Sequence, residues 1–197
     1  PTTQVVVYDR SGQTFCGRAW WMMKWCGHEA VAILDGGMAA WQAVGGAMAS
    51  GVAPQVPAKS AYPLAAPLVA VTELDTVWRH LDSDQTIVDA RAPARYRGDV
   101  EPLDPIAGHI PGALNMPFSE NFDADGRFKS LDSLRQMWMK LLGDCNHAHV
   151  VMHCGSGVSA VPNVVSMALA GLPTPTLYAG SWSEWSRHPD TPKTKEV

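Results

Sequence analysis

The sequence has no run of basic residues and no long uninterrupted apolar stretch. Its 15 Lys and Arg residues are outnumbered by 19 Asp and Glu, which gives a formal net charge of −4. This balance argues against nucleic acid or an anionic membrane as a partner. Gly, Pro or His interrupts each apolar stretch well before the length that spans a bilayer, and the first residues do not follow the basic-then-apolar pattern of a leader. We therefore expect a globular protein with neither kind of partner.

Cysteine is scarce, and its spacing fits neither a disulfide framework nor a paired zinc motif. Cys16, Cys26, Cys145 and Cys154 follow no regular interval. Because disulfides persist in oxidising compartments, four unpatterned cysteines indicate reduced thiols. We expect a cytosol-like compartment and a cytoplasmic location.

The segment around His149 is rich in metal-ligand residue types. If residues 147–153 form a strand, His147, His149 and His153 share one face, where zinc or copper could bind. Both faces of a parallel strand are packed, however, and neighbouring Cys154 has a better explanation in the loop that follows it. We therefore predict no metal and no cofactor.

Cys154 stands where a strand pattern gives way to a loop. A short apolar strand over residues 150–152 leads into Cys154-Gly155-Ser156-Gly157-Val158-Ser159, and a helical pattern follows. The glycines let the backbone turn its N–H groups inward, and the helix N-terminus adds its positive dipole end. Ser156 adds a hydroxyl, and Pro162 falls in the first helical turn, where a missing N–H costs little. The loop therefore favours a nucleophilic thiolate at Cys154 and would equally stabilise a persulfide.

No arginine follows this loop at the spacing that cysteine phosphatases need. In those enzymes five residues separate the cysteine from a phosphate-binding arginine, but Ala160 occupies that position and the next arginine is Arg187. Sulfur transfer needs no such arginine, because a thiolate takes the terminal sulfur of a donor and passes it to a second thiol or to cyanide. The loop thus favours sulfur transfer over phosphate hydrolysis.

The two ends of the chain carry the same pattern. A strand, a helix and a second strand are indicated at residues 5–9, 15–26 and 31–34, and again at residues 150–154, 159–170 and 176–178. At nearly constant spacing, Asp9 matches Cys154, Gly12 matches Gly157, Gly27 matches Gly171 and Trp41 matches Trp185. The first copy should be inactive, because it holds Asp9 at the cysteine position. We also expect its first half to lie outside this sequence, in a longer two-domain protein.

Domain boundaries follow from this repeat. Residues 1–46 form the partial, inactive domain, residues 47–67 form an Ala-, Pro-, Gly- and Ser-rich linker, and residues 68–197 form the catalytic domain.

Helices and strands alternate through the catalytic domain. Thr72 is predicted to cap a helix, residues 86–89 form a strand, and Ser130 opens a helix that Gly143 closes. Such alternation predicts an α/β fold, an open parallel sheet with helices on both faces. Asp89 and Cys154 then lie at the carboxyl ends of strands, where sites in such sheets form.

The cysteine loop and several other segments resemble the tandem-domain rhodanese family, specifically its 3-mercaptopyruvate sulfurtransferases. Residues 154–160 are similar to that group's Cys-Gly-Ser-Gly-Val-Thr-Ala, with Ser159 in place of threonine. The other similar segments are residues 108–113, residues 89–91 with Arg95 and Tyr96, residues 34–37 with Trp41, and residues 180–182 with Trp185. The resemblance implies a rhodanese-like fold, with one complete domain plus the C-terminal half of an inactive copy.

Roles for individual residues follow from this resemblance. It implies that Cys154 carries the persulfide, that Ser156 helps to move a proton to the leaving group, and that Arg95 binds the carboxylate of the donor; Gly155, Gly157, Val158 and Ser159 complete the active-site loop. Leu103 stands where many mercaptopyruvate enzymes have a second arginine. The family's Asp and His partners of the loop serine come from the half of the first domain that this sequence does not contain.

The expected reaction moves sulfane sulfur from 3-mercaptopyruvate to cyanide or to a thiol acceptor, such as a thioredoxin-like protein or a low-molecular-weight thiol. Thiosulfate-preferring relatives carry Arg-Lys after the cysteine, so the Gly-Ser pair here favours a donor with a single carboxylate. A thiosulfate:cyanide sulfurtransferase and a non-catalytic rhodanese-like binding module are the alternatives.

The other arginines and the tryptophan-rich segment have structural interpretations. Arg91 is interpreted as a structural ion-pair former, and Arg97 and Arg187 as surface residues. The Trp and Met residues at 20–25 are interpreted as core or domain interface, partly exposed if half of that domain is absent. A separate N-terminal fragment or a second copy of the chain would then be their partner.

Overall fold

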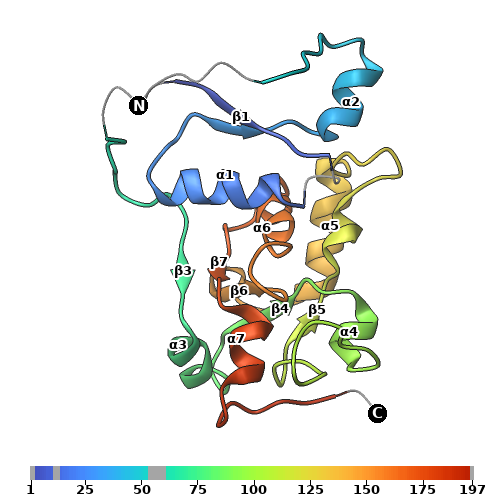
Figure 1. The fold of residues 1–197 in the computed structure, drawn as a ribbon. Coiled ribbons are helices and arrows are strands. Elements are labelled where there is room, and N and C mark those ends of the chain that lie inside the picture. The colour runs from blue at the N-terminus through green and yellow to red at the C-terminus, as the bar shows by residue number, and fades with distance from the viewer. Residues whose placement is uncertain (1–2, 11–13, 53–60, 196–197) are drawn as a thin grey trace.

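The chain forms two α/β units that lie against each other (Figure 1). The computed structural model describes residues 3–10, 14–52 and 61–195. The first unit contains β1 (Val5–Val7), α1 (Cys16–Trp25), β2 (Val31–Ile33) and α2 (Gly37–Ala43). Its two strands are parallel, with Val5 opposite Val31 and Val7 opposite Ile33. Gly12 and residues 53–60 of the expected linker lie outside the described residues.

The second unit is built on five parallel strands. Their order across the sheet is β3-β7-β6-β4-β5. In chain order the unit contains β3 (Val71–Thr72), α3 (Leu74–Arg79), β4 (Thr86–Asp89), α4 (Pro93–Arg97), β5 (Leu114–Asn115), η1 (Phe118–Asn121), α5 (Leu131–Leu142), η2 (His147–His149), β6 (Val150–His153), α6 (Val161–Leu169), β7 (Thr176–Tyr178) and α7 (Ser181–Arg187).

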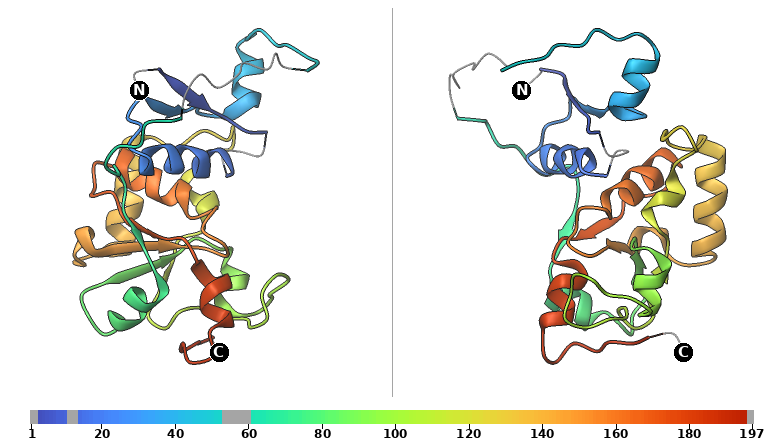
Figure 2. Two further views of the ribbon diagram at one scale, coloured as in Figure 1. Left: turned by 60° about the vertical axis from the view of Figure 1, so that its left-hand side comes forward. Right: turned by 45° about the vertical axis from the view of Figure 1, so that its right-hand side comes forward.

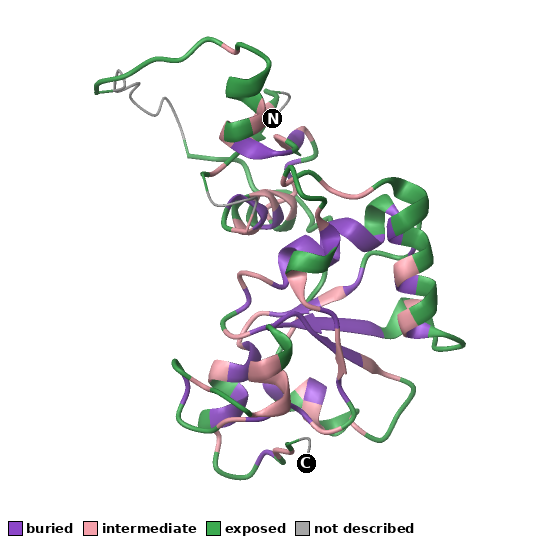
Figure 3. Cartoon of the chain, turned by 90° about the vertical axis from the view of Figure 1, so that its right-hand side faces the viewer, coloured by how far each residue is buried: buried purple, intermediate pink, exposed green. Residues whose placement is uncertain are grey.

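Helices cover both faces of this sheet (Figure 2). Side chains alternate along a strand, so Val88 and Met152 face α5 and α6, while Ile87 and Val151 face α3 and α7. The central strands β4, β6 and β7 are mostly buried, and purple strands run through the middle of the molecule in Figure 3. The predicted fold class, an open parallel sheet with helices on both faces, is confirmed.

Helix α5 shows how the local sequence sets an element. The Ser130 side chain accepts a hydrogen bond from the N–H of Ser133, and Gly143 ends the helix with a φ of 54°. Leu134, Trp138 and Leu142 form its buried stripe. Both predicted ends of this helix are confirmed.

Two local predictions are wrong. Thr72 belongs to β3 and does not cap α3, which begins after Glu73 without a side-chain cap. Residues 147–149 form the 3-10 turn η2 rather than part of a strand, so His147 and His149 do not share a strand face with His153. Among the residues that the structure describes, no cluster of His, Cys, Asp or Glu could hold a metal ion.

The two units meet where α1 packs on α6. A Cβ added to Gly17 would lie 3.3 Å from Cγ1 of Val161, so the backbones approach closely here. Trp21 is buried in the same core as Val161 and Val164. The N–H of Phe128 also donates to Oδ1 of Asp35, at 3.0 Å. The tryptophan-rich segment is therefore partly interface. A search of the described residues found no helix with the length and apolar character of a membrane span.

Candidate active site

Cys154 follows β6 directly, at the carboxyl edge of the sheet, and only 1% of it is exposed. The first residues of α7 hold its backbone: its N–H donates to Oγ of Ser181 (3.2 Å), and its carbonyl accepts from the N–H of Trp182 (3.0 Å). The N–H of Ser183 donates to the carbonyl of Gly155 at 2.8 Å. The cysteine is thus fixed from two elements, β6 and α7.

Ser181 has an unusual backbone for its residue type. Its φ of 55° lies in the left-handed region, and it is the one non-glycine residue with positive φ in the described structure. Oγ of Ser181 donates to the carbonyl of Tyr178 (2.9 Å) while accepting from Cys154. The strained residue therefore stands directly behind the predicted nucleophile. The sequence marks it only as part of a closing segment.

The loop after Cys154 presents free backbone donors. Between residues 155 and 160, no N–H donates a hydrogen bond to another described residue. Gly157 has a φ of 72°, and a Cβ there would collide with the carbonyl oxygen of Ala179, so only glycine fits. Pro162 falls in the first turn of α6, as predicted. Such a loop, followed by a helix N-terminus, can bind an anion.

The other predicted loop residues lie together around this site. Ser156 is exposed at the loop surface, Gly155, Val158 and Ser159 are half-buried, and Gly157 is buried. The predicted set is thus brought together in space, and each assigned role stays a prediction.

Arg95, on α4, lies beside the same loop. Its Nη1 atom is 3.3 Å from the position that a Cβ on Gly155 would occupy. Nη2 of Arg95 is 2.6 Å from Oε1 of Glu101 and 3.4 Å from Oδ2 of Asp104. Nη1 itself donates no hydrogen bond to a described residue. Arg95 therefore points a free N–H group at the cysteine loop.

Glu101 and Asp104 are functional neighbours that sequence reasoning missed. Burial raises the pKa of the Glu101 carboxyl, but hydrogen bonds from Arg95 and from the N–H groups of Leu103 and Asp104 outweigh it, and the net pKa is lowered. Leu103, which lies between the two acids in the sequence, is 72% exposed. The signal in the sequence was the pair of acids on either side of Leu103.

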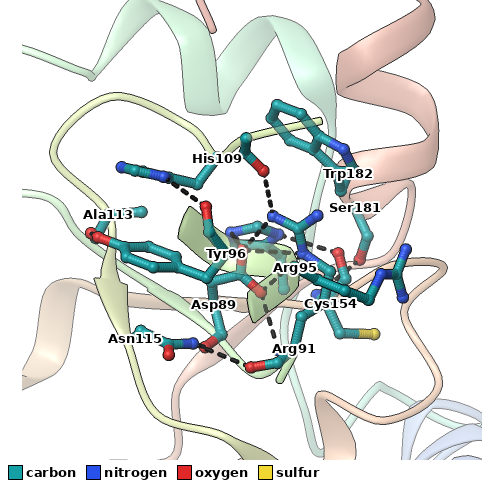
Figure 4. A network of polar contacts seen from close by, with 12 residues as sticks. Asp89, Arg91, Arg95, Tyr96, His109, Ala113, Asn115, Cys154, Ser181 and Trp182 are labelled. Atoms are coloured by element: carbon teal, nitrogen blue, oxygen red, sulfur yellow. Dashed lines mark hydrogen bonds and ion pairs between the residues drawn. The ribbon is translucent and has the colours of Figure 1, made fainter. Parts of the chain in front are cut away.

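Arg91 and Asp89 form a buried ion pair beneath this site (Figure 4). Nε and Nη2 of Arg91 bind both carboxylate oxygens of Asp89, the shortest contact being 2.6 Å, and Nη2 also donates to the carbonyl of Gly108. The guanidinium lies over the ring of Trp182 at 4.8 Å. In Figure 4 the sulfur of Cys154 points away from this pair. The geometry agrees with the structural role expected of Arg91.

His153 lies next to Cys154 and is buried. Burial lowers its pKa, although the charge of Asp89, 3.6 Å away, acts in the opposite direction. Its Nε2 atom has no hydrogen-bond partner among the described residues.

Residues 108–113 fix α4 and, through it, Arg95. The ring of His109 stacks on Tyr96 at 3.9 Å and its Nδ1 pairs with the carbonyl of Tyr96 at 2.7 Å. The Tyr96 hydroxyl donates to the carbonyl of Ala113. Gly108 has a φ of 123° and leaves no room for a side chain against Thr194. This segment is a structural support for the site.

Asp9 of the first unit, the residue that the repeat in the sequence aligns with Cys154, binds the start of α1. Its Oδ2 atom accepts hydrogen bonds from the N–H groups of Phe15 and Cys16, both at 2.9 Å, at the start of α1. Its carbonyl accepts from the N–H of Met38. Burial, with the charge of Asp9, raises the pKa of the Cys16 thiol to about 12, which keeps this thiol protonated.

The first unit also reaches the cysteine loop. Nη1 of Arg18, on α1, donates to the carbonyl of Gly157 at 3.4 Å, and its guanidinium lies over the ring of Trp21. The loop is therefore contacted by a guanidinium from each unit: Arg95 at Gly155 and Arg18 at Gly157.

The site therefore combines a cysteine at the carboxyl edge of a parallel sheet with a loop whose N–H groups donate to no described residue, an arrangement that fits cysteine-based group transfer. The rhodanese-like domain model matches residues 1–44 and 73–188. The chain belongs to the rhodanese-like domain family.

Among curated proteins, the chain is 43% identical over 192 residues to "Probable 3-mercaptopyruvate sulfurtransferase" of Pseudomonas aeruginosa, covering 96% of this chain and 67% of that protein. It is 41% identical over 193 residues to the Mycobacterium tuberculosis protein SseB, which carries the provisional name of a thiosulfate sulfurtransferase. This match covers 95% of the chain and 66% of SseB. The chain thus spans about two thirds of the length of these relatives. Their names support a sulfurtransferase function.

Among solved structures, an anaerobic ergothioneine biosynthesis enzyme from Chlorobium limicola matches with a TM-score of 0.88 and 24% identity. The match covers 100% of this chain and 52% of that one. At this identity the likeness concerns the fold alone.

Proposed function

We propose that the chain transfers sulfane sulfur from 3-mercaptopyruvate to a thiol acceptor, or to cyanide, through a persulfide on Cys154. One observation carries this proposal: a thiol at the carboxyl edge of the sheet opens a loop whose N–H groups have no partner among the described residues, and Nη1 of Arg95 lies beside that loop. The relative of Pseudomonas aeruginosa named for this substrate supports the choice of donor.

The first half-reaction loads the sulfur. The thiolate of Cys154 attacks the sulfur of 3-mercaptopyruvate, so an S–S bond forms as the C–S bond breaks, and the electron pair leaves on carbon as the enolate of pyruvate. The enolate takes up a proton, a step in which the Ser156 hydroxyl participates. Arg95 binds the donor carboxylate, and the loop N–H groups stabilise the anionic sulfur.

The second half-reaction transfers the sulfur from Cys154 to the acceptor. An acceptor thiolate attacks the outer sulfur of the persulfide, forms its own persulfide and releases the Cys154 thiolate, which gives a ping-pong scheme. We propose a thioredoxin-like protein or a low-molecular-weight thiol as the acceptor, and a cytoplasmic location, which the four free cysteines support. We further propose that the first unit is an inactive copy of the second.

Thiosulfate is the second candidate donor, because the Mycobacterium tuberculosis relative carries that name. Arg95 is the arginine whose Nη1 approaches Gly155, and two buried acids already face it. A compact dianion is therefore a poorer match to the site than a monocarboxylate.

Initial rates on the two donors test the proposal. We expect kcat/KM for 3-mercaptopyruvate to exceed that for thiosulfate, with parallel-line kinetics against a thiol acceptor. Arg95→Ala should raise KM for 3-mercaptopyruvate about tenfold, because a charge-assisted hydrogen bond is lost, while Arg79→Ala on α3 serves as control. A preference for thiosulfate would favour the second candidate, and no turnover of either donor would leave a binding module.

A further inference from the structure

An alternating row of charges runs from the end of β4 to α7. Each member lies within 3.4 Å of the next, and in order the members are Asp89, Arg91, Glu101, Arg95, Asp104 and Arg187. Three carboxylates face three guanidinium groups, so the row is neutral as a whole. Its inner members are buried, whereas Arg95 is partly exposed and the Arg187 side chain is 55% exposed.

Asp104 is the buried carboxylate that two arginines share. Oδ2 lies 3.4 Å from Nη2 of Arg95, and Oδ1 lies 3.0 Å from Nη1 of Arg187. Oδ1 is buried and accepts no hydrogen bond from a described residue. Because an uncompensated buried charge is costly, the charge of Arg187 is what balances this oxygen.

Without Arg187, the balance of charge around the Arg95 guanidinium would change. Glu101 already binds Nη2 and Nε of Arg95, and Asp104, having lost its other cation, would draw the same guanidinium toward itself. Nη1 of Arg95 would then move from Gly155, and the row would carry a net negative charge. Both changes weaken the site for an anion that approaches the cysteine loop.

Arg187 also belongs to the helix that holds the cysteine. Its Nη1 atom donates to the carbonyl of Ser183, whose N–H binds the carbonyl of Gly155, and α7 begins with the Ser181 that binds Cys154. Arg187 thus contacts Asp104, which faces Arg95, and also belongs to the helix that holds Cys154.

We propose that Arg187 is a positioning residue for anionic donors, which acts through Asp104 to keep Nη1 of Arg95 directed at the cysteine loop and available to a carboxylate. This inference deepens the proposed function and rests on it for the identity of the donor. It departs from the sequence interpretation of Arg187 as a plain surface residue.

Two alkylating reagents with the same leaving group test carboxylate recognition without turnover. Iodoacetate carries a carboxylate and iodoacetamide does not, and each forms an S–C bond as iodide leaves. We measure the ratio of their rates at Cys154 in the full chain by peptide mass spectrometry, with exposed Cys145 as the internal reference. Arg187→Ala should lower the iodoacetate-to-iodoacetamide ratio at Cys154 about fivefold, as expected for loss of one nearby charge.

Charge-matched variants separate this role from a merely structural one. Arg187→Lys should restore most of the ratio, and the double variant Asp104→Asn with Arg187→Ala should return it to the wild-type value, because the row is then neutral again. Asp104→Asn alone should raise the ratio above wild type. Arg79→Ala removes an exposed arginine whose hydrogen bonds to described residues stay within α3, and it should change nothing.

Steady-state kinetics distinguish failure of this inference from failure of the proposed function. Arg187→Ala should raise KM for 3-mercaptopyruvate about fivefold with kcat nearly unchanged, since it acts on binding of the anion. An unchanged alkylation ratio in Arg187→Ala would overturn the inference, even if the wild type turns over 3-mercaptopyruvate. A fivefold lower ratio in a protein that takes no sulfur from either donor would support anion recognition while refuting the sulfurtransferase assignment.

Discussion

The units β1-α1-β2-α2 and β6-α6-β7-α7 place different side chains, Asp9 and Cys154, in similar backbone surroundings. The helix begins seven residues after Asp9 in one and seven after Cys154 in the other. The carbonyl of each accepts an N–H from the helix after the second strand, from Met38 or from Trp182. The carboxylate of Asp9 accepts hydrogen bonds from two N–H groups at the start of α1, whereas the N–H groups of residues 155–160 donate to no described residue. Asp9 therefore holds the start of a helix, whereas Cys154 leaves the N–H groups of its loop available to a ligand.

The two units also differ in how their second sheet face is covered. Val151, Tyr178, Trp182 and Trp185 are buried in one cluster with Leu74 and Val77 of α3. At the matching positions of the first unit, Val6, Leu34, Met38 and Trp41 line an apolar groove, and Val6 is 50% exposed. The second unit therefore has a sealed core on this face, while its counterpart does not within the described residues. The residue that we propose as the nucleophile thus stands in the unit with the more completely buried core.

The largest expected effect is on the nucleophile itself. Cys154→Ser should reduce turnover at least about a thousandfold, because covalent catalysis is lost, with little change in the free energy of unfolding. Cys145→Ser, which removes an exposed thiol, is the matched control and should keep full activity. Equal losses in the two variants would contradict the assignment of the site.

Ser181 offers a direct exchange between the units, because its counterpart Gly37 has nearly the same left-handed φ, 58° against 55°. Ser181→Gly should relieve about 1 kcal/mol of backbone strain but leave the N–H of Cys154 without its partner. We expect turnover to fall about tenfold, as a loosened nucleophile loses its orientation, while thermal unfolding changes little. Full activity would show that Ser181 is not needed behind Cys154.

Asp9→Ala in the first unit should lower stability while leaving turnover nearly unchanged. Loss of the cap should lower the free energy of unfolding by about 1 kcal/mol, measured by urea titration. Turnover by the folded protein should change less than twofold, since Asp9 lies outside the cysteine loop. A large loss of turnover with unchanged stability would assign the first unit a catalytic part.

Arg18→Ala tests the contact from the first unit to the loop. The hydrogen bond to Gly157 is long, 3.4 Å, so we expect a loss of about twofold in kcat/KM, equivalent to a few tenths of a kcal/mol. Arg18→Lys is the conservative comparison. No change in either variant would mean that the loop keeps its shape without the first unit.

The smallest expected effect is on the pH dependence of stability. Because burial lowers the pKa of His153 in the folded state below the ordinary 6.5, the unfolded chain binds the proton more readily. The free energy of unfolding should therefore fall as the pH drops below about 6.5. His153→Gln should flatten this slope between about pH 6.5 and 5. Tyr8, at the matching position, is exposed, and Tyr8→Phe should leave the slope unchanged.

The sequence predicts the parts of the site that depend on local pattern. The strand before Cys154, the glycine at 157, the proline in the first turn and the capped helix α5 each follow from residue type and spacing, and each is present. What it misses depends on the folded chain: Glu101 and Asp104 meet Arg95 because a loop returns to α4. The strands β3 and β5 have two residues each, too few for a periodic signal, and Thr72 was misassigned for that reason.

Mapping of transferred sulfur tests the central claim most directly. The full chain is incubated with 3-mercaptopyruvate, digested under conditions that preserve persulfides, and each of its cysteine peptides is examined for a gain of one sulfur atom. The account predicts that gain on the Cys154 peptide, lost again on addition of a thiol acceptor, and no comparable gain at Cys16, Cys26 or Cys145. Sulfur spread equally over exposed Cys145 and Cys154, or absent from Cys154, would contradict it.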